Sequence, residues 1–168
     1  MEYSIRTVRE EDAASIVELL NPIIQAGKYT ILDKQLSVDD QIYFIRGFPE
    51  RGIFYVAVCN DSQHVLGIQD VAPISAEWSS AFKHVGETST FVSLASHRKG
   101  IGRSLSHATF RAAKERGFLK ISATIRADNA QAVSFYLSQG FRIIGTAQKH
   151  AFVRGKYIDE ILTERFID

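Results

Sequence analysis

Hydrophobic residues recur along the chain with two different spacings. Over residues 119–126 apolar and polar residues alternate, which is the period of a strand with one buried face. From Ile16 to Ile24 apolar residues return every three or four positions, which is the period of an amphipathic helix. Pro22 lies inside this stretch, and because proline lacks an amide hydrogen, we expect it to kink or end the helix. The alternating apolar positions are Leu119, Ile121, Ala123 and Ile125, and the helical ones are Ile16, Leu19, Leu20, Ile23 and Ile24.

Capping residues and turn residues define the other elements. Ser37 followed by Asp40 resembles a helix-capping signal, which predicts a helix over residues 38–46. The other predicted helices run from Ile101 to Gly117 and from Asn129 to Gly140, and the other predicted strands are Tyr3–Val8, Phe54–Cys59, Val65–Val71, Val85–Leu94, Phe141–Gln148 and Phe152–Phe166.

The order of these elements predicts a mixed α/β fold. A strand, a helix and a second strand follow one another over residues 85–126, and such a crossover places the two strands parallel. The last two strands follow each other closely and predict an antiparallel pair. Because the sequence contains no internal repeat, Pro/Ser-rich linker or low-complexity block, we predict one domain over residues 1–168.

Composition and charge exclude several classes of function. The 168 residues are 45% hydrophobic and 11% aromatic, which suffices for one well-packed core. Twenty basic and nineteen acidic residues give a net charge of +1, so no overall field favours nucleic acid or an anionic membrane. Cys59 is the only cysteine, which excludes a disulfide framework and a thiolate metal cluster. The histidines share no ligand spacing with a carboxylate or thiolate, so we expect no metal.

The chain carries no signal for a membrane. Its first residues contain no basic stretch followed by an apolar one, and no segment approaches the roughly 18 apolar residues of a membrane helix. We therefore expect a soluble, cytoplasmic protein.

The segment from Phe91 to Leu105 is the most informative for chemistry. A predicted strand ends, a loop with Gly100 and Gly102 follows, and a predicted helix begins. Glycines let the backbone approach an anion, and the free amides of a helix N-terminus can hold a pyrophosphate. The loop lacks the Gly-x-x-x-x-Gly-Lys pattern of a Walker loop and the Gly-x-Gly-x-x-Gly pattern of a dinucleotide site. A plain strand-to-helix connector is the alternative interpretation.

The loop resembles the acetyl-CoA loop of the GCN5-related N-acetyltransferases (GNAT), which usually reads Arg or Gln, two residues, Gly, any residue, then Gly or Ala. Residues 125–136 and the pair Gly140-Phe141 are similar to the family's Asn-to-Tyr helix and the Gly-Phe that follows it. The resemblance implies acetyl-CoA as cosubstrate, no metal, and a sheet of about seven strands, mostly antiparallel with a central parallel pair, flanked by about four helices. The residues it implies for CoA binding are Val92, Leu94, His97, Arg98, Lys99, Gly100, Gly102, Arg103, Ser104 and Asn129.

The resemblance also implies a role for Tyr136. By that match the side chain lies beside the thioester sulfur and protonates the departing thiolate, whereas packing in the core is the alternative. One departure from the family pattern is His97, which stands where Arg or Gln is usual. Because backbone amides make most of the contacts in this loop, we expect a changed CoA affinity and not its loss.

Within the family, residues 81–92 are similar to the phosphinothricin acetyltransferase branch, which reads Ala-Tyr-Arg, two or three residues, then Glu-x-Ser-x-Tyr-Val. The match implies that Glu87 is the general base, since an ammonium group must lose a proton before it can attack a thioester. A solvent-facing strand glutamate is the alternative. The residues we expect at the acceptor are Tyr29, Thr30, Phe82, which lacks the hydroxyl of the branch's Tyr, and Tyr157, which replaces its Trp.

We therefore predict an N-acetyltransferase that moves an acetyl group from acetyl-CoA to the primary amine of a small molecule, such as an amino acid or an analogue. A peptide or protein N-terminus is the alternative acceptor. An acyl-CoA-binding module without turnover and a structural α/β domain are the alternatives from other classes. We expect neither nucleic acid nor membrane as a partner, and the sequence leaves a homodimer open.

Overall fold

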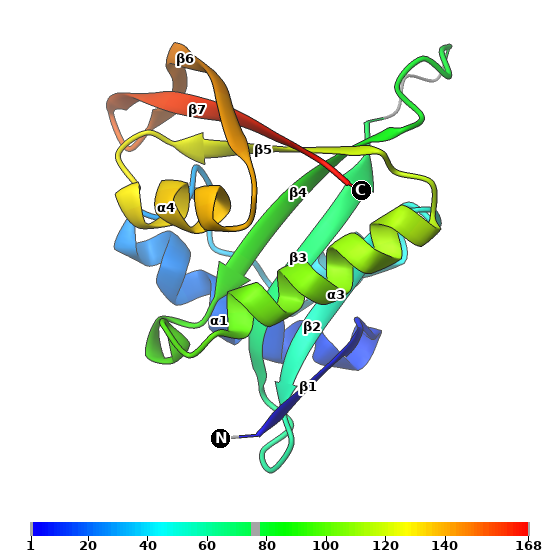
Figure 1. Cartoon of the computed structure of the whole chain (residues 1–168). Helices are drawn as coiled ribbons and strands as arrows, with labels where there is room; N and C mark the ends of the chain where they lie inside the picture. The colour runs from blue at the N-terminus through cyan, green and yellow to red at the C-terminus, as the bar shows by residue number, and fades with distance from the viewer. Residues whose placement is uncertain (1, 75–77, 168) are drawn as a thin grey trace.

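The computed structural model describes residues 2–74 and 78–167 of the chain (Figure 1). These residues form seven strands and four α-helices, with short 3-10 helices at Glu10–Asp12 (η1) and Leu94–Ser96 (η2). The strands are β1 (Tyr3–Thr7), β2 (Ile53–Cys59), β3 (Val65–Pro73), β4 (Val85–Val92), β5 (Lys120–Arg126), β6 (Arg142–Val153) and β7 (Lys156–Phe166). The α-helices are α1 (Ala13–Ala26), α2 (Val38–Arg46), α3 (Ile101–Glu115) and α4 (Ala130–Ser138).

All seven strands form one sheet in the order β1-β2-β3-β4-β5-β7-β6. Every neighbouring pair is antiparallel except β4 and β5, so the predicted parallel pair is confirmed. These two strands pair only from Val85 opposite Lys120 to Glu87 opposite Ser122. Beyond this point β4 and β5 diverge, and α4 lies on the side where they separate (Figure 1).

Apolar contacts place helices on both faces of the sheet. The buried stripe of α1 packs with Phe54 and Val56 of β2 and Ile68 of β3. On the other face, Phe110 of α3 and Phe141 after α4 belong to the same cluster as Val71 and Ile121. The sheet is therefore the middle layer, and the divergence of β4 and β5 opens it between the helices.

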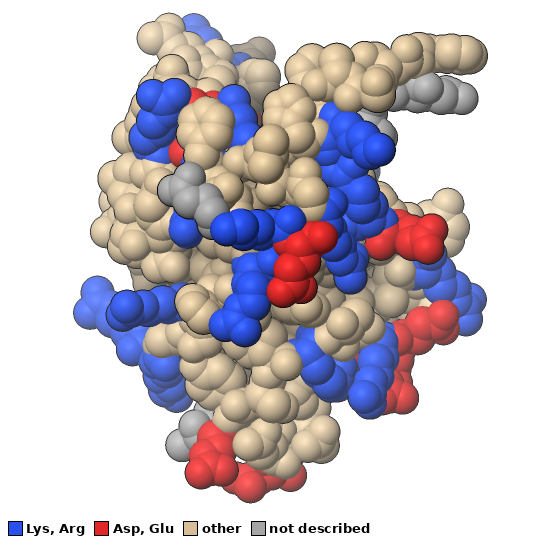
Figure 2. Space-filling view, turned by 45° about the vertical axis from the view of Figure 1, so that its right-hand side comes forward, with Lys and Arg blue, Asp and Glu red and all other residues tan. Residues whose placement is uncertain are grey.

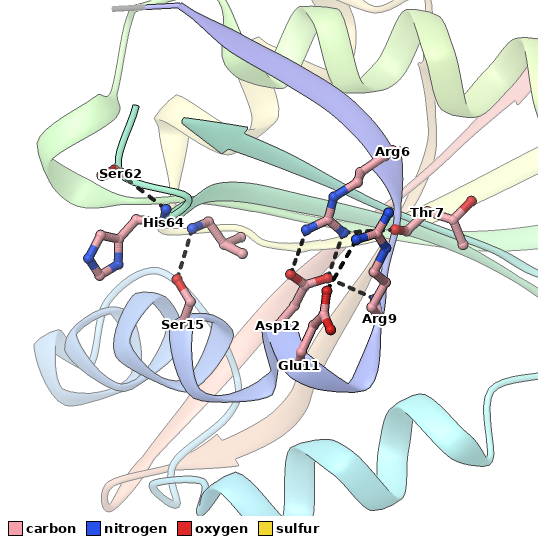
Figure 3. A network of polar contacts seen from close by, with 9 residues as sticks. Arg6, Thr7, Arg9, Glu11, Asp12, Ser15, Ser62 and His64 are labelled. Atoms are coloured by element: carbon pink, nitrogen blue, oxygen red, sulfur yellow. Dashed lines mark hydrogen bonds and ion pairs between the residues drawn. The ribbon is translucent and has the colours of Figure 1, made fainter. Parts of the chain in front are cut away.

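A compact polar network fixes the entry from β1 into α1 (Figure 3). The Asp12 carboxylate accepts two hydrogen bonds of 2.8 Å from the Arg6 guanidinium and one of 2.7 Å from the Arg9 amide. The Ser15 hydroxyl accepts a hydrogen bond of 2.8 Å from the Val65 amide, so α1 is also held to the start of β3. The Arg6 guanidinium and the Arg9 amide keep the pKa of Asp12 below its ordinary value against the opposing effect of burial.

Several element ends differ from those expected from sequence. The last two strands were expected to be Phe141–Gln148 and Phe152–Phe166, but β6 continues to Val153 and the turn before β7 lies at Arg154 and Gly155, so Phe152 belongs to β6. Pro22 does not end α1, which continues to Ala26 and stops at Gly27 with a φ of 70°, because burial of Ile23 and Ile24 holds the last turn on the sheet. The strand expected to reach Leu94 ends at Val92, and Leu94 begins η2. Leu119 is exposed, since β5 starts one residue later and its alternation begins there.

The surface carries charges of both signs. On the face drawn in Figure 2, Lys and Arg side chains form several groups with Asp and Glu among them. No helix among the described residues is both long and apolar enough to cross a membrane.

Candidate active site

A cleft of about 340 Å³ opens where β4 leaves β5. Its walls come from β4, from the loop that leads to α3, from the first turn of α3, and from α4, with Ile23 and Tyr29 on the side of α1. Of the residues predicted from sequence it is lined by Tyr29, Val92, Leu94, His97, Arg98, Gly100, Gly102, Arg103, Asn129 and Tyr136. The structure thus brings together three separate parts of the chain, around residues 23–29, 90–103 and 129–139.

The loop before α3 has the backbone of an anion site. Arg98 and Gly100 both adopt the left-handed conformation, with φ values of 61° and 79°. No side chain of the described residues caps α3, so the amides of its first turn are free for an external acceptor. Gly102 leaves room for the Phe135 ring, because a Cβ atom at this position would lie 3.0 Å from Phe135 Cε2.

Two cations at this end of the cleft are available to a ligand. Arg98 and Arg103 line it, are exposed, and form no ion pair with a carboxylate in the part of the chain that the structure describes. Lys99 and Ser104 lie outside the lining. The Lys99 ammonium donates to the Ala95 carbonyl at 3.0 Å, and the Ser104 hydroxyl is hydrogen bonded to the Tyr3 hydroxyl at 2.9 Å.

Tyr136 of α4 lines the cleft. Its ring is buried between Phe135 and Phe141, with centroid separations of 5.2 and 5.1 Å, and its hydroxyl donates to Thr90 Oγ1 at 3.0 Å. Burial raises the pKa of this phenol well above its ordinary value, more than the hydrogen bond to Thr90 lowers it. Tyr136 therefore stays protonated and acts as a hydrogen-bond donor.

Sequence reasoning missed Thr90 and Gln69, which support this part of the cleft. The fully buried Gln69 amide donates to Thr90 Oγ1 at 2.8 Å and to Ser106 Oγ at 3.0 Å. Two consecutive polar residues, Gln69 and Asp70, in the apolar strand β3 are a signal that could have pointed to them. A core strand rarely buries an amide unless it is hydrogen bonded.

Asn129 and His97 are bound within the protein. The Asn129 amide donates to the Tyr29 carbonyl at 3.1 Å, and its oxygen accepts from the Ala132 amide at 3.1 Å. Imidazole Nε2 of His97 donates to the Val92 carbonyl at 3.1 Å, and the ring meets the edge of Tyr29 at a centroid separation of 6.2 Å. Both side chains thus hold the loop after α1 against the cleft.

Glu87 lies on the other face of β4 from Thr90, because successive side chains of a strand alternate. Its carboxylate is exposed, at the last position where β4 pairs with β5, and it does not line the cleft. Asp70 of β3 shares this face and accepts hydrogen bonds from Ser89. The carboxylates of Glu87 and Asp70 therefore lie on one face of the sheet, and the Tyr136 hydroxyl lies on the other.

The expected acceptor residues do not form one group. Tyr29 lines the cleft, whereas Thr30 is buried and its carbonyl accepts from Arg126 at 2.9 Å. Phe82 and Tyr157 lie outside the lining, and both are exposed; Tyr157 stacks on Phe152 with a centroid separation of 4.9 Å. In the described ranges no group of three His, Cys, Asp or Glu residues is placed to hold a metal ion.

Comparisons with known proteins identify a family and a fold. The family model for the acetyltransferase (GNAT) domain matches residues 5–162. Among solved structures, the Salmonella typhimurium protein yncA with its cofactor acetyl-CoA is 21% identical with a TM-score of 0.89, covering 100% of this chain and 95% of that one. The Sinorhizobium meliloti phosphinothricin acetyltransferase with AcCoA is 20% identical with a TM-score of 0.88, covering 99% and 89%. A search of curated protein sequences finds no significant match.

Proposed function

Because this chain belongs to the GNAT acetyltransferase family, we propose that it transfers an acetyl group from acetyl-CoA to the primary amine of a small molecule such as an amino acid or an analogue. The observation that carries the proposal is the cleft itself. A free helix N-terminus, two cations and Tyr136 all line it.

The end of the cleft at α3 suits the diphosphate of CoA. The free amides of residues 101–103 present donors to phosphate oxygens, and the helix dipole favours negative charge at this position. Arg98 and Arg103 add charge without first breaking an ion pair with a carboxylate among the described residues. The edge of β4 beyond Glu87 faces the cleft without a partner from β5 and would pair with the amides of an extended arm.

Residues on the two faces of β4 have different roles in the proposed reaction. Glu87 accepts the proton of the incoming ammonium group from the face it shares with Asp70. Donors near Tyr136 stabilise the sulfur that departs when the acyl–sulfur bond breaks. No covalent intermediate on the enzyme is required, since the amine and the thioester are both bound when the amine attacks.

The test combines binding with turnover. Calorimetry should detect binding of CoA, and release of free thiol from acetyl-CoA should be followed with amino acids, other small amines and peptides with free N-termini. Turnover with a small amine supports the proposal. Turnover restricted to peptides would replace the acceptor class, and CoA binding without turnover on any amine would indicate a binding module.

A further inference from the structure

The Thr90 hydroxyl group is fully used as an acceptor. Tyr136 donates to Oγ1 at 3.0 Å and Gln69 Nε2 donates to the same atom at 2.8 Å, so both lone pairs of the oxygen are taken. A threonine hydroxyl also has one hydrogen to donate, and no residue in the described ranges accepts it. Because Thr90 lines the cleft, this hydrogen is free to be donated to a ligand in the cleft.

The Tyr136 hydroxyl is in the opposite situation. Its only hydrogen is directed to Thr90, and its ring is held between Phe135 and Phe141. The donor that the pair presents to a ligand is therefore the hydroxyl of Thr90 and not that of Tyr136. A hydroxyl that accepts two hydrogen bonds is polarised and becomes a stronger donor.

We infer that Thr90 is a catalytic residue that donates a hydrogen bond to the sulfur atom of the bound thioester, and that Tyr136 and Gln69 position its hydroxyl. This rests on the proposed function, which places a thioester in the cleft. As the acyl–sulfur bond breaks, negative charge gathers on sulfur and the hydrogen bond from Thr90 becomes stronger. Thr90 keeps its proton in this step, and CoA leaves as a thiolate that takes a proton from the amine nitrogen through solvent.

Gln69 makes the arrangement rigid. Gln69 is fully buried, and its amide donates to both Thr90 on β4 and Ser106 on α3. Rotation of the Thr90 side chain would therefore leave a buried N–H donor of Gln69 unpaired. The Gln69 Oε1 atom is buried and has no hydrogen-bond partner among the described residues. Toward Thr90, Gln69 therefore acts only as a donor, through Nε2.

The test compares Thr90→Val with Thr90→Ser, and uses Thr88→Val as the matched control. Thr88 lies two residues earlier on the same face of β4, is buried, and donates to the Asp70 carbonyl without lining the cleft. The first readout needs no acceptor amine: the pKa of the CoA thiol bound to each variant, followed by the ultraviolet absorbance of the thiolate. The second is the single-turnover rate of acetyl transfer.

Thr90→Val should raise the pKa of the bound thiol and slow transfer by about 10- to 10²-fold, a smaller loss than that of a full oxyanion-hole donor. Thr90→Ser should restore both to within about threefold of wild type, and Thr88→Val should change neither. Equal thiol pKa values and rates in Thr90→Val and Thr88→Val, with CoA bound to both, would overturn the inference and leave the proposed function intact. A wild-type protein that binds no CoA would overturn the proposed function as well.

Tyr136→Phe decides between the two hydroxyls, and Thr90→Ala takes the place of Thr90→Val in each comparison if the valine variant does not fold. Tyr136→Phe keeps the ring and removes only the donor to Thr90, so it should raise the thiol pKa and slow transfer less than Thr90→Val does. The variant with both changes should be no slower than Thr90→Val alone, because Tyr136 acts through Thr90. A larger loss in Tyr136→Phe than in Thr90→Val would make Tyr136 the direct donor and refute the assignment.

Discussion

The carboxylate of Asp70 accepts a hydrogen bond of 2.7 Å from the hydroxyl of Ser89, directly across the β3–β4 ladder. The Ser89 amide adds a second one of 3.3 Å to the other carboxylate oxygen. Burial nevertheless raises the pKa of Asp70 to about 6, and the negative charge of Glu87 on the same face raises it further. The hydrogen bonds from Ser89 act in the opposite direction and do not compensate.

This relationship predicts a pH-dependent stability. Since the pKa of Asp70 is higher in the folded than in the unfolded chain, the folded state binds more protons between pH 4 and about 6. The contribution of this group to stability is therefore fully present below about pH 4 and is lost as pH rises through about 6. Asp70→Asn keeps an acceptor for the Ser89 hydroxyl and removes the charge, so it should stabilise the fold at pH 8, by on the order of 1–3 kcal/mol.

Denaturant unfolding at pH 4 and pH 8 measures this difference. Asp33→Asn is the control, because Asp33 is exposed in the segment between α1 and α2. The gain in Asp70→Asn should appear at pH 8 and shrink at pH 4, where the wild-type carboxyl is largely protonated. An equal effect at both pH values would mean that Asp70 does not carry a raised pKa.

A second prediction concerns the buried guanidinium of Arg126. It forms a bidentate pair with Asp128 at 2.8 and 2.7 Å and donates to the carbonyls of Gly27 at 3.1 Å and Thr30 at 2.9 Å. Arg126→Gln removes this anchor and leaves two carbonyls without their donor, so it should cost about 2–3 kcal/mol. For a chain of this size the midpoint of thermal unfolding should fall by about 5–10 °C.

Arg9→Gln gives the comparison for Arg126→Gln. Arg9 and Glu11 form an ion pair of 3.1 Å in which both side chains are mostly exposed, so its loss should change stability by less than about 1 kcal/mol. Because the anchor of Arg126 also holds the segment that contains Tyr29, the KM for the acceptor should rise more than the KM for acetyl-CoA. Two variants of equal stability would contradict this account of Arg126.

The local sequence pattern predicted most strands and helices, because apolar residues recur in each element with the period of that structure. The helix at 38–46 and the parallel pair followed from the Ser37 cap and the crossover order, and both are confirmed. The end of β4 could not be found in this way. Leu94 is apolar and therefore continues the strand pattern, but the chain turns into η2 at this residue. That α1 continues past Pro22 could not be predicted either, because the burial of Ile23 and Ile24 depends on the packed sheet and not on the local sequence.

The candidate site shows the same division. The glycine loop and Tyr136 were recognisable as motifs, and the structure places both at the cleft. Thr90 and Gln69 have no motif, because their role depends on a ladder that sets them opposite each other on β4 and β3. The internal use of the Asn129 amide was equally hidden, since its partner, the Tyr29 carbonyl, lies 100 residues away in sequence.

A third prediction separates Glu87 from Asp70, the two carboxylates on the face of the sheet opposite to Thr90. If Glu87 is the base, Glu87→Gln should lower turnover by roughly 10²- to 10⁴-fold while CoA affinity stays nearly unchanged. Asp70→Asn should have a smaller effect on turnover, because it removes a neighbouring charge and leaves the Glu87 carboxylate in place. Steady-state rates over pH 5–9 test both variants. Wild-type turnover in Glu87→Gln with strong loss in Asp70→Asn would transfer the role of base to Asp70.

The last prediction concerns Gly102 in the first turn of α3. A Cβ atom here would lie 3.0 Å from Cε2 and 3.2 Å from Cζ of Phe135, so a valine must displace that ring, which lines the cleft. Gly102 is helical, where valine is at least as favourable as glycine, so the fold itself should lose little. Gly102→Val should therefore weaken CoA binding by about tenfold or more, which corresponds to about 1.4 kcal/mol for each factor of ten.

Gly145→Val is the matched control for Gly102→Val, because Gly145 lies in β6 and a Cβ atom there meets no atom within 4 Å. Calorimetric titration with CoA, together with the midpoint of thermal unfolding, separates a lost site from a lost fold. Gly102→Val should lose affinity at a nearly unchanged midpoint, whereas Gly145→Val should keep both. A folded Gly102→Val protein with wild-type affinity would show that the ligand does not pass between the start of α3 and Phe135, and the CoA site would then have to lie elsewhere on the chain.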